Sequence, residues 1–324
     1  MYKFEQLEGK LNEFMEEMDF LRQPLNLYEP VQYAMHQGGK RVRPLLVLIA
    51  TDMFSDDISQ AKYAAQAVEL LHNSTLIHDD IMDASPLRRG KPTLYQKYGT
   101  SMAILSADVV CAMAYEKLMS CDKEKTYALM KTLISVFIKV CEGQALDMNF
   151  EKRNDISTKD YITMISLKTG ILIAGALKLG AIVGGASAGD MNALSEVGLY
   201  MGIAFQLQDD VLDVWSDLKD FGKVAGTDIA DNKRTILYLK AIEKANDEDK
   251  HRLFELYNNV STNVSEKIRE VKAIFEKYDV KTDVENMAKL YVEKALTSLE
   301  GIQVASERKE NLNTLINNLL KRNK

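Results

Sequence analysis

Proline is scarce in this chain: only 5 of its 324 residues are Pro. Because proline interrupts helices and sheets, its scarcity allows long helices to run almost from end to end. The chain also lacks a Pro/Gly/Ser-rich linker and any low-complexity tract. Its length alone would allow two domains, but the missing linker favours a single domain over residues 1–324.

Cysteine is rarer still, with only 3 residues. Cys111, Cys121 and Cys141 are odd in number and lack the paired spacing of zinc ligands, so we interpret them as reduced core thiols. That interpretation indicates a reducing compartment, and we expect a cytoplasmic protein. The amino terminus has no apolar signal core. The most apolar segment, residues 171–189, contains Lys178 and falls short of the ~20 uncharged residues that span a bilayer, so we expect no transmembrane segment.

Positive charge is not in excess. The net charge is -6, whereas a general nucleic-acid binder needs a basic face, so we expect no nucleic-acid partner. Basic loops in such a chain are better suited to a small anion. The hydrophobic content of 46% can bury a large core, and we interpret Trp215 and the 15 methionines as packing residues.

Helical periodicity fills most of the chain, and no convincing strand alternation interrupts it. Pro30 suits a first helical turn, Gly38 and Gly39 would end that helix, and Ser85 with Pro86 would stop a later one. We therefore predict an all-α fold, with helices over residues 2–21, 30–37, 43–54, 58–84, 101–121, 123–150, 157–184, 189–217, 234–245, 247–260, 262–278, 281–300 and 303–321.

The pattern Asp-Asp-x-x-Asp occurs twice, at residues 79–83 and 209–213, each time at the end of an apolar helical stretch. Positions i and i+4 of a helix stand over one another, so Asp79 and Asp83 share a face. Like charges placed this way repel, and a hard cation such as Mg²⁺ would compensate them. A single such motif could be a merely solvated helix end. Two copies with the same spacing favour a metal-diphosphate site.

Cations accompany the acidic motifs. The first motif is followed by Arg88-Arg89-Gly90-Lys91, and the second by Gly222-Lys223 and Lys233-Arg234. A third basic group, Lys40 to Arg43, follows a glycine pair whose flexible backbone would let several cations enclose a phosphate. Carboxylates for metal and cations for phosphate thus occur side by side.

One polar stripe runs along the predicted helix of residues 58–84. His72, Thr75, Asp79 and Asp83 are separated by three, four and four residues, so they lie on one face of an otherwise apolar helix. A lone histidine on such a helix is more often a hydrogen-bonded core residue. Its alignment with the carboxylates favours a place in the site.

Seven short elements occur in order along the chain: Gly38-Gly39-Lys40-Arg41-Val42-Arg43-Pro44, Leu70 to Asp83, Arg88-Arg89-Gly90, Glu142-Gly143-Gln144, Lys168-Thr169-Gly170, Phe205 to Asp210 and Gly222-Lys223. Through these elements, residues from about 28 to 235 resemble the trans-isoprenyl diphosphate synthases, or polyprenyl synthetase family, and among them the geranylgeranyl diphosphate synthases. The remaining carboxy-terminal helices fit more loosely. The resemblance implies an isoprenoid synthase fold: a single large helical bundle around a deep apolar cavity, with the acidic motifs facing across its mouth, in a homodimer.

The resemblance implies a reaction in which isopentenyl diphosphate is condensed head to tail with an allylic diphosphate. Mg²⁺ held by Asp79, Asp83 and Asp209 would assist loss of the allylic diphosphate, and the released diphosphate would accept the final proton. Asp80, Asp210 and Asp213 would be auxiliary. The residues implied for the allylic diphosphate are Arg88, Lys168 and Lys223, and those for isopentenyl diphosphate are Lys40, Arg43, His72 and Arg89.

Further residues come from the same resemblance. Lys168, Thr169 and Gln206 lie within predicted helices, where a buried cation or amide needs partners, and we expect diphosphate oxygens and the cationic intermediate to supply them. A structural hydrogen bond is the alternative for Gln206. Lys233 would bind substrate, but Asn232 stands where the family usually has glycine, and no proline follows Thr235, so the role of Lys233 stays open. Ala107-Asp108 replaces the Gly-Asp of many members.

Product length should depend on the helix that carries the first motif. Ser74 and Thr75 stand five and four residues before Asp79, where short-product members often have aromatics. One helical turn advances ~5.4 Å, about one isoprene unit, so small side chains leave room for a further condensation, with Leu70 and Leu71 as the next floor. We expect geranylgeranyl diphosphate or a somewhat longer product; farnesyl diphosphate is the alternative.

Two other functions compete with chain elongation. A class I terpene cyclase also ionises a prenyl diphosphate at an Asp-rich helix, but it has no need for a second diphosphate pocket at Lys40, Arg43 and His72. A non-catalytic partner subunit should show a decayed aspartate motif, and both motifs are intact here. The sequence favours the active prenyltransferase.

Overall fold

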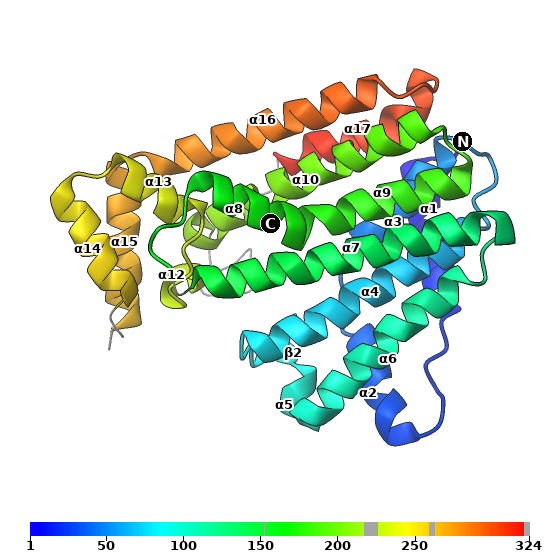
Figure 1. Ribbon diagram of the computed structural model, residues 1–324, viewed down its shortest axis with the longest axis horizontal. Coiled ribbons are helices and arrows are strands. Elements are labelled where there is room, and N and C mark those ends of the chain that lie inside the picture. The colour runs from blue at the N-terminus through cyan, green and yellow to red at the C-terminus, as the bar shows by residue number, and fades with distance from the viewer. Residues whose placement is uncertain (152, 217–225, 259–262, 321–324) are drawn as a thin grey trace. The chain divides into compact units, whose positions relative to one another are not determined.

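The computed structural model describes residues 1–151, 153–216, 226–258 and 263–320. Within them the secondary structure is helical apart from one short hairpin, so the all-α prediction is confirmed (Figure 1). The helices are α1 Phe4–Glu16, α2 Leu25–Met35, α3 Val42–Asp52, α4 Ala61–Met82, α5 Leu94–Tyr98, α6 Thr100–Leu118, α7 Lys123–Phe150, α8 Thr158–Ile165, the π-helix η1 Ser166–Gly170, α9 Ile171–Gly184, α10 Ala188–Trp215, α12 Thr227–Ala230, α13 Ile236–Lys244, α14 Asp247–Asn258, α15 Val264–Lys277, α16 Val280–Glu300 and α17 Ser306–Leu319. The hairpin pairs β1 Leu87–Arg88 with β2 Lys91–Pro92.

Several predicted details are wrong. Pro30 lies inside α2 rather than in its first turn, because the helix begins at Leu25, directly after Pro24. The predicted helix over residues 157–184 contains the π-turn η1, and the hairpin, α5 and α12 were not predicted. The last three elements are two to five residues long, too short to show a period.

The cysteine interpretation holds in part. Cys111, Cys121 and Cys141 form no disulfide with one another in the described structure, and only Cys121 is buried. Cys141 is exposed and Cys111 is half-buried, so the prediction of core thiols is wrong for Cys141. Cys141 lies on α7, a helix that exposes residues on both sides of it in the sequence.

Contacts between Cα atoms divide the chain into two compact units. The first unit comprises residues 1–138, 172–195 and 301–312, and the second comprises residues 139–171, 196–300 and 313–324. Their boundaries fall inside α7, α10 and α17, at the start of α9 and at the end of α16. Each unit carries one of the two acidic motifs. The prediction of a single domain stays a prediction.

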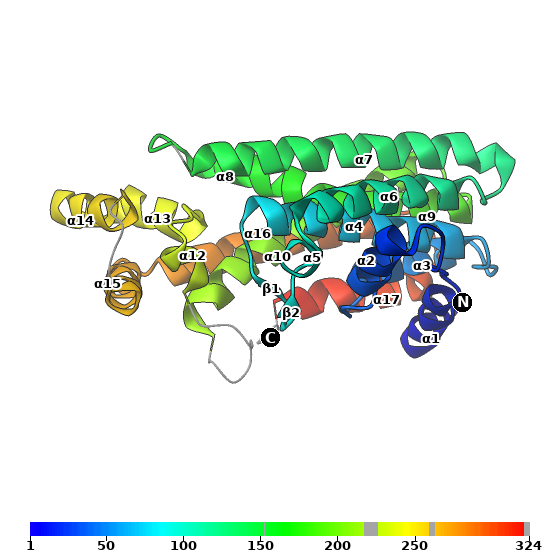
Figure 2. The same ribbon diagram turned by 90° about the horizontal axis from the view of Figure 1, so that it is seen from below.

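In the first unit, α4 packs along α6 and against α3 (Figures 1 and 2). Alanines on both helices, among them Ala67 on α4 and Ala103 and Ala107 on α6, are fully buried and permit a close approach. Gly180 on α9 meets α3 so closely that a Cβ there would lie 2.3 Å from the carbonyl oxygen of Val47. This packing fixes the end of α4, where the first acidic motif lies.

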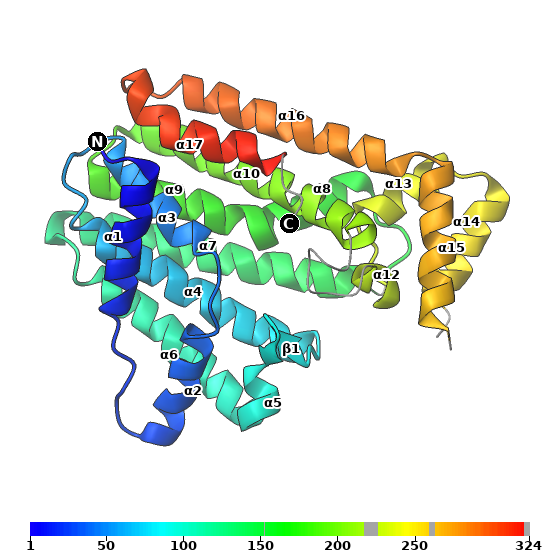
Figure 3. The same ribbon diagram turned by 180° about the vertical axis from the view of Figure 1, so that it is seen from behind.

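In the second unit, a core of buried apolar residues joins α8, α10 and the helices α13 to α16. Figure 3 shows these helices from behind. Phe275, Leu253, Val271 and Ile236 are each at most 1% exposed, so the carboxy-terminal helices contribute fully buried residues to this core. The core anchors α10, which carries the second acidic motif.

One helical stretch, residues 158–184, is long and apolar enough to span a membrane by length and composition. However, 67% of its apolar window is buried by the rest of the protein. A helix that is mostly buried by its own protein is typical of a core helix.

Candidate functional site

The first acidic motif occupies the end of α4. Asp79 is half-buried and Asp83, the residue that follows the helix, is exposed, so carboxylates one turn apart remain accessible. Asp80, by contrast, is only 4% exposed: its Oδ1 accepts a hydrogen bond from Nε of Arg88 at 2.7 Å and forms an ion pair with Nη2 at 2.7 Å. Burial raises the pKa of Asp80, and the guanidinium opposes that rise. Arg88, predicted to bind diphosphate, thus has a carboxylate partner within the protein.

The hairpin after α4 presents the adjacent arginine. Arg88 pairs with Lys91, which leaves Arg89 and Gly90 as a two-residue loop with φ values of 53° and 75°. Two successive positive φ angles define a type I′ turn, in which asparagine and glycine are the usual residues. Arg89 therefore holds a left-handed conformation that is unfavourable for a residue with a Cβ. Such strain is a mark of positions whose side-chain placement matters.

The guanidinium of Arg89 lies against the Gly38-Gly39 backbone. A Cβ built on Gly39, whose φ is 136°, would lie 2.7 Å from the guanidinium carbon, whereas a Cβ on Gly38 would meet nothing within 4 Å. Gly39 thus makes the space that the Arg89 guanidinium fills, while the predicted role of the glycine pair in enclosing a phosphate stays a prediction.

Arg43 and His72 also meet, as their common predicted pocket requires. Nη1 of Arg43 donates to Nε2 of His72 at 3.2 Å, which fixes the neutral tautomer with its proton on Nδ1. Burial and the charges of Arg43 and Arg89 hold the pKa of His72 well below 6.5. Burial lowers the pKa of Arg43 to about 10, which leaves it protonated at neutral pH. Lys40, from the same predicted set, is exposed.

The sequence analysis missed Glu69, one turn before His72. It is 6% exposed, and Nδ2 of Asn73 donates to its Oε1 at 3.2 Å. Its negative charge favours the protonated forms of Arg43 and Arg89, against their burial. A lone acid in an apolar helix carries no signal by itself; its offset of three residues from His72 was the available clue.

The second acidic motif is tied to a relay of hydrogen bonds. Thr169 Oγ1 donates to Gln206 Oε1 at 3.0 Å, and Gln206 Nε2 donates to Asp210 Oδ1 at 3.0 Å. The hydroxyl of Tyr161 donates to Asp210 Oδ2 at 2.5 Å. Burial first, and then the charge of Asp228, raise the pKa of Asp210 well above its usual value.

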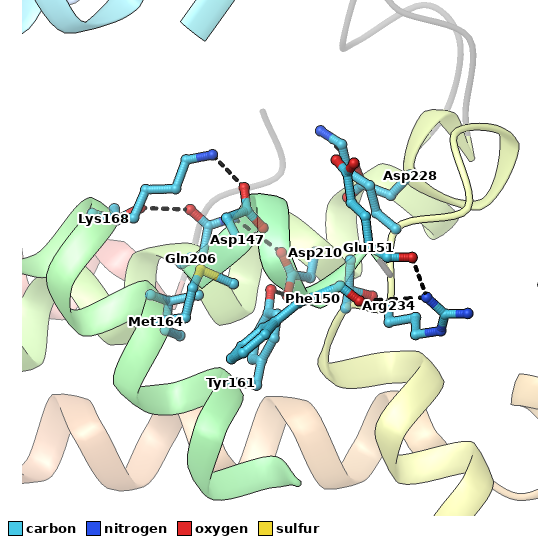
Figure 4. Close-up of a pocket in the computed structure, with 14 residues that line it drawn as sticks. Asp147, Phe150, Glu151, Tyr161, Met164, Lys168, Gln206, Asp210, Asp228 and Arg234 are labelled. Atoms are coloured by element: carbon cyan, nitrogen blue, oxygen red, sulfur yellow. Dashed lines mark hydrogen bonds and ion pairs between the residues drawn. The ribbon is translucent and has the colours of Figure 1, made fainter. Parts of the chain in front are cut away.

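Lys168 is held by a residue that sequence reasoning missed. Its Nζ donates to Asp147 Oδ2 at 2.5 Å (Figure 4). We expected ligand atoms as the partners of Lys168 and Gln206, but both have protein partners as well. The available clue to Asp147 was its spacing: it stands one helical turn, four residues, after Gly143, which belongs to the resemblance element Glu142-Gly143-Gln144.

The turn that carries Lys168 and Thr169 is the π-helix η1, and glycines confine it on two sides. A Cβ on Gly143 of α7 would lie 2.3 Å from the backbone nitrogen of Lys168, and a Cβ on Gly202 of α10 would lie 2.4 Å from Cα of Gly170. Backbone therefore packs directly on backbone, which places Lys168 and Thr169 with little freedom.

Asp213, the last residue of the second motif, anchors a loop. Its carboxylate accepts from Thr227 Oγ1 at 2.8 Å and from the Asp228 N–H at 3.0 Å, at the start of α12. At the other end of α12, Lys233 Nζ lies 3.9 Å from Asp228 Oδ1. Lys223, another predicted cation, lies outside the described residues.

A model of the family described as polyprenyl synthetase matches residues 24–277. The chain belongs to the polyprenyl synthetase family. The match also reaches past the predicted range of about 28–235, into the carboxy-terminal helices. This polyprenyl synthetase is accordingly a prenyltransferase with the all-α isoprenoid synthase fold.

Individual relatives agree with the family. The chain is 38% identical to a short chain isoprenyl diphosphate synthase of Methanothermobacter thermautotrophicus, over 88% of this chain and 87% of that protein. It is 36% identical to a geranylgeranyl diphosphate synthase of Sulfolobus acidocaldarius, over 87% and 86%.

Solved structures show the same fold. A crystal structure of a geranylgeranyl pyrophosphate synthase superposes with a TM-score of 0.95 at 38% identity, covering 99% of both chains. A polyprenyl synthase from Caulobacter crescentus, crystallised with calcium and isoprenyl diphosphate, superposes with a TM-score of 0.88 at 26% identity, covering 99% of this chain and 96% of that one.

A charged pocket in the second unit of this polyprenyl synthetase gathers many of the site residues (Figure 4). Carboxylates and cations both line it, so it can receive a phosphate group together with a cation. The charged residues that line it are Asp147, Glu151, Asp210, Asp228, Lys168, Lys233 and Arg234.

The described residues contain no group of three or more His, Cys, Asp or Glu side chains close enough to hold a metal. Mg²⁺ in proteins usually takes one or two carboxylates and completes its shell with water and substrate phosphate. The accessible carboxylates of Asp79 and Asp83 have the right chemistry for it.

Proposed function

We propose that this polyprenyl synthetase condenses isopentenyl diphosphate with an allylic diphosphate. The observation that carries the proposal is the presence of two separate basic sets, each in its own unit. The set in the first unit consists of Arg43, His72 and Arg89, and the negative charge of Glu69 favours the protonated form of Arg43. The set in the second unit contains Lys168 and Lys233, which line the charged pocket. Two diphosphate substrates account for two such sets, whereas a terpene cyclase would need one.

Within this proposal Asp79, Asp83 and Asp209 hold Mg²⁺. The ion, when bound, neutralises the negative charge that grows on the departing diphosphate. Two observations support the assignment: the carboxylate oxygens are hard ligands of the kind Mg²⁺ prefers, and the Caulobacter crescentus relative was crystallised with a divalent cation and isoprenyl diphosphate. Asp80, Asp210 and Asp213 act indirectly, since each is hydrogen-bonded to its neighbours in the protein.

The protein's own groups bind and orient the substrates. Lys168, oriented by Asp147, donates to the allylic diphosphate, and Thr169 and Gln206 present fixed dipoles beside it. Arg43 and Arg89 bind the diphosphate of isopentenyl diphosphate. Neutral His72 accepts from Arg43 through Nε2, which leaves its Nδ1 proton available for a phosphate oxygen. The released diphosphate takes the final proton.

We propose geranylgeranyl diphosphate or a somewhat longer chain as the product. Relatives named for both products support this: the geranylgeranyl diphosphate synthase of Sulfolobus acidocaldarius, and a geranylfarnesyl diphosphate synthase of Aeropyrum pernix that is 34% identical over 94% of this chain. Small side chains at Ser74 and Thr75 are consistent with a tail longer than farnesyl.

A primer series tests the proposal. The protein is incubated with Mg²⁺, labelled isopentenyl diphosphate and dimethylallyl, geranyl or farnesyl diphosphate, and the products are sized by chromatography. Elongation of the primers to one final length is expected. A hydrocarbon formed from a single prenyl diphosphate would instead indicate a cyclase, and absence of any product would indicate a partner subunit.

We further propose a homodimer in the cytoplasm. The support for a dimer is a set of large apolar side chains exposed on α6, directly after it and on the first part of α7, namely Ile104, Leu105, Met119, Tyr127, Ile134 and Ile138. Light scattering should give twice the chain mass for the wild type. Leu105→Glu should shift it towards the monomer, whereas Leu25→Glu, at an exposed leucine on α2, should not.

A further inference from the structure

Asn232 occupies a backbone position that favours glycine. Its φ is 60°, and it follows the end of α12. The Asn232 N–H donates to Ile229 O at 3.2 Å and the Lys233 N–H donates to Asp228 O at 2.9 Å, which is the pattern of a Schellman motif. Glycine takes this left-handed conformation without steric cost, while asparagine is the less common choice. An asparagine here therefore calls for a compensating contact of its side chain.

Lys267 on α15 makes that contact. Its Nζ donates to Asn232 Oδ1 at 2.5 Å, and the residue is only 3% exposed. The same Nζ lies 5.2 Å from the ring centroid of Tyr257. A buried ammonium needs an acceptor, because its desolvation is otherwise uncompensated. A glycine at position 232 could not provide one.

The residues next to Asn232 belong to the charged pocket. Lys233 follows directly, lines the pocket and lies 3.9 Å from Asp228. Arg234 comes next and donates through Nη1 to the carbonyl oxygen of Glu151 at 2.6 Å. The hydrogen bond from Lys267 thus joins α15 to the short segment that presents Lys233.

We propose that Lys267 and Asn232 form a pair of positioning residues that fixes the segment bearing Lys233, so that Lys233 can bind the diphosphate of the allylic substrate. Neither residue of the pair needs to touch substrate. The proposal rests on the proposed function, because the role of Lys233 in substrate binding is part of it. It also explains why asparagine occupies position 232, where the backbone conformation favours glycine: its side chain accepts from Lys267.

A double-mutant cycle tests the pair, using Asn232→Gly, Lys267→Met and the two together in the full chain. Each single substitution removes the hydrogen bond that fixes the segment, so KM for the allylic substrate should rise at least fivefold in both single variants. The double variant lacks the same hydrogen bond, so its KM should be no higher than that of the weaker single variant. KM for isopentenyl diphosphate should stay within twofold throughout, since Arg43, His72 and Arg89 are unchanged.

Two further variants serve as controls. Asn232→Asp keeps an acceptor for Lys267 and should remain within twofold of wild type. Lys277→Met makes the same substitution on α15 at an exposed lysine that pairs with Asp249, and should change neither KM. Thermal unfolding of every variant shows whether a change in KM merely follows a loss of stability.

Binding of inorganic diphosphate with Mg²⁺, followed by calorimetry, gives a second readout that does not need turnover. A wild type inactive with every primer would refute the proposed function, while coupling in the calorimetric cycle would still support the pair. Additive effects of the two substitutions would overturn the pair. Equal rises in both KM values that match the loss of stability would also overturn it, because they would show a structural role alone.

Discussion

The contact between Gly39 and Arg89 leads to a sharp test of the isopentenyl diphosphate pocket. In Gly39→Ala the new Cβ would lie 2.7 Å from the guanidinium carbon of Arg89. The guanidinium is the far end of a flexible side chain, so it should swing away while the fold is retained. Binding then loses a charge-assisted hydrogen bond, worth about 1.5 to 3 kcal/mol. At 1.4 kcal/mol per factor of ten, KM for isopentenyl diphosphate should rise roughly ten- to hundredfold.

Two controls separate the contact from backbone strain. Gly38→Ala also places alanine at a positive φ, here 86°, but its Cβ would meet nothing within 4 Å. It should reduce the free energy of unfolding by up to about 2 kcal/mol, seen as a lower unfolding temperature. KM for isopentenyl diphosphate should change little. Arg89→Ala removes the group that Gly39→Ala displaces, so the double variant should be no worse than Arg89→Ala alone.

Steady-state kinetics at saturating allylic primer, combined with thermal unfolding, provides the measurement. The reasoning fails if Gly38→Ala raises KM for isopentenyl diphosphate as much as Gly39→Ala does. It also fails if Gly39→Ala adds its full effect in the Arg89→Ala background, because the alanine would then act by another route.

Other predictions concern α4 and the acidic motifs. His72→Gln should keep KM for isopentenyl diphosphate within a few fold. Because the pKa of His72 is lowered in the folded protein, only the unfolded chain takes up this proton just below about pH 6.5, and the wild type loses stability there. The substitution should remove that part of the loss, and an unchanged pH profile of unfolding would contradict this. Ser74→Phe and Thr75→Phe should both shorten the product on chromatography, but only Ser74→Phe should also cost more than about 2 kcal/mol, since Ser74 is fully buried. Asp79→Ala or Asp209→Ala should reduce turnover at least about a hundredfold with unchanged circular dichroism, and near-normal rates at saturating Mg²⁺ would argue against the metal assignment.

Long helices and their polar residues could be predicted because period and spacing are local properties of the sequence. The helix predicted over residues 123–150 is found with those bounds, and α4 lies inside its predicted range. The stripe on α4 was likewise visible, and the structure adds that Thr75 donates to the His72 carbonyl oxygen within it. The spacing along the sequence therefore predicted which residues share one face of α4.

Partners distant in sequence could not be predicted in this way. Asp147 lies 21 residues from Lys168, and Tyr161 lies 49 residues from Asp210, so no local pattern joins them. The ion pair of Asp80 with Arg88 spans only eight residues, but it depends on the hairpin, whose strands are two residues long. These contacts decide which predicted ligands already have protein partners.

The π-helix η1 makes the number of residues between α8 and α9 important. A π-turn accommodates one residue more than an α-turn, and one residue corresponds to about 100° of rotation around the helix axis. The side chains of α9 are therefore out of phase with those of α8, and no single stripe can be drawn through residues 158–184. Deleting one residue between Ser166 and Gly170 would restore the phase and rotate one half of the helix against the other. Lys168 and Thr169 thus depend on an additional residue in the chain as much as on their own identity.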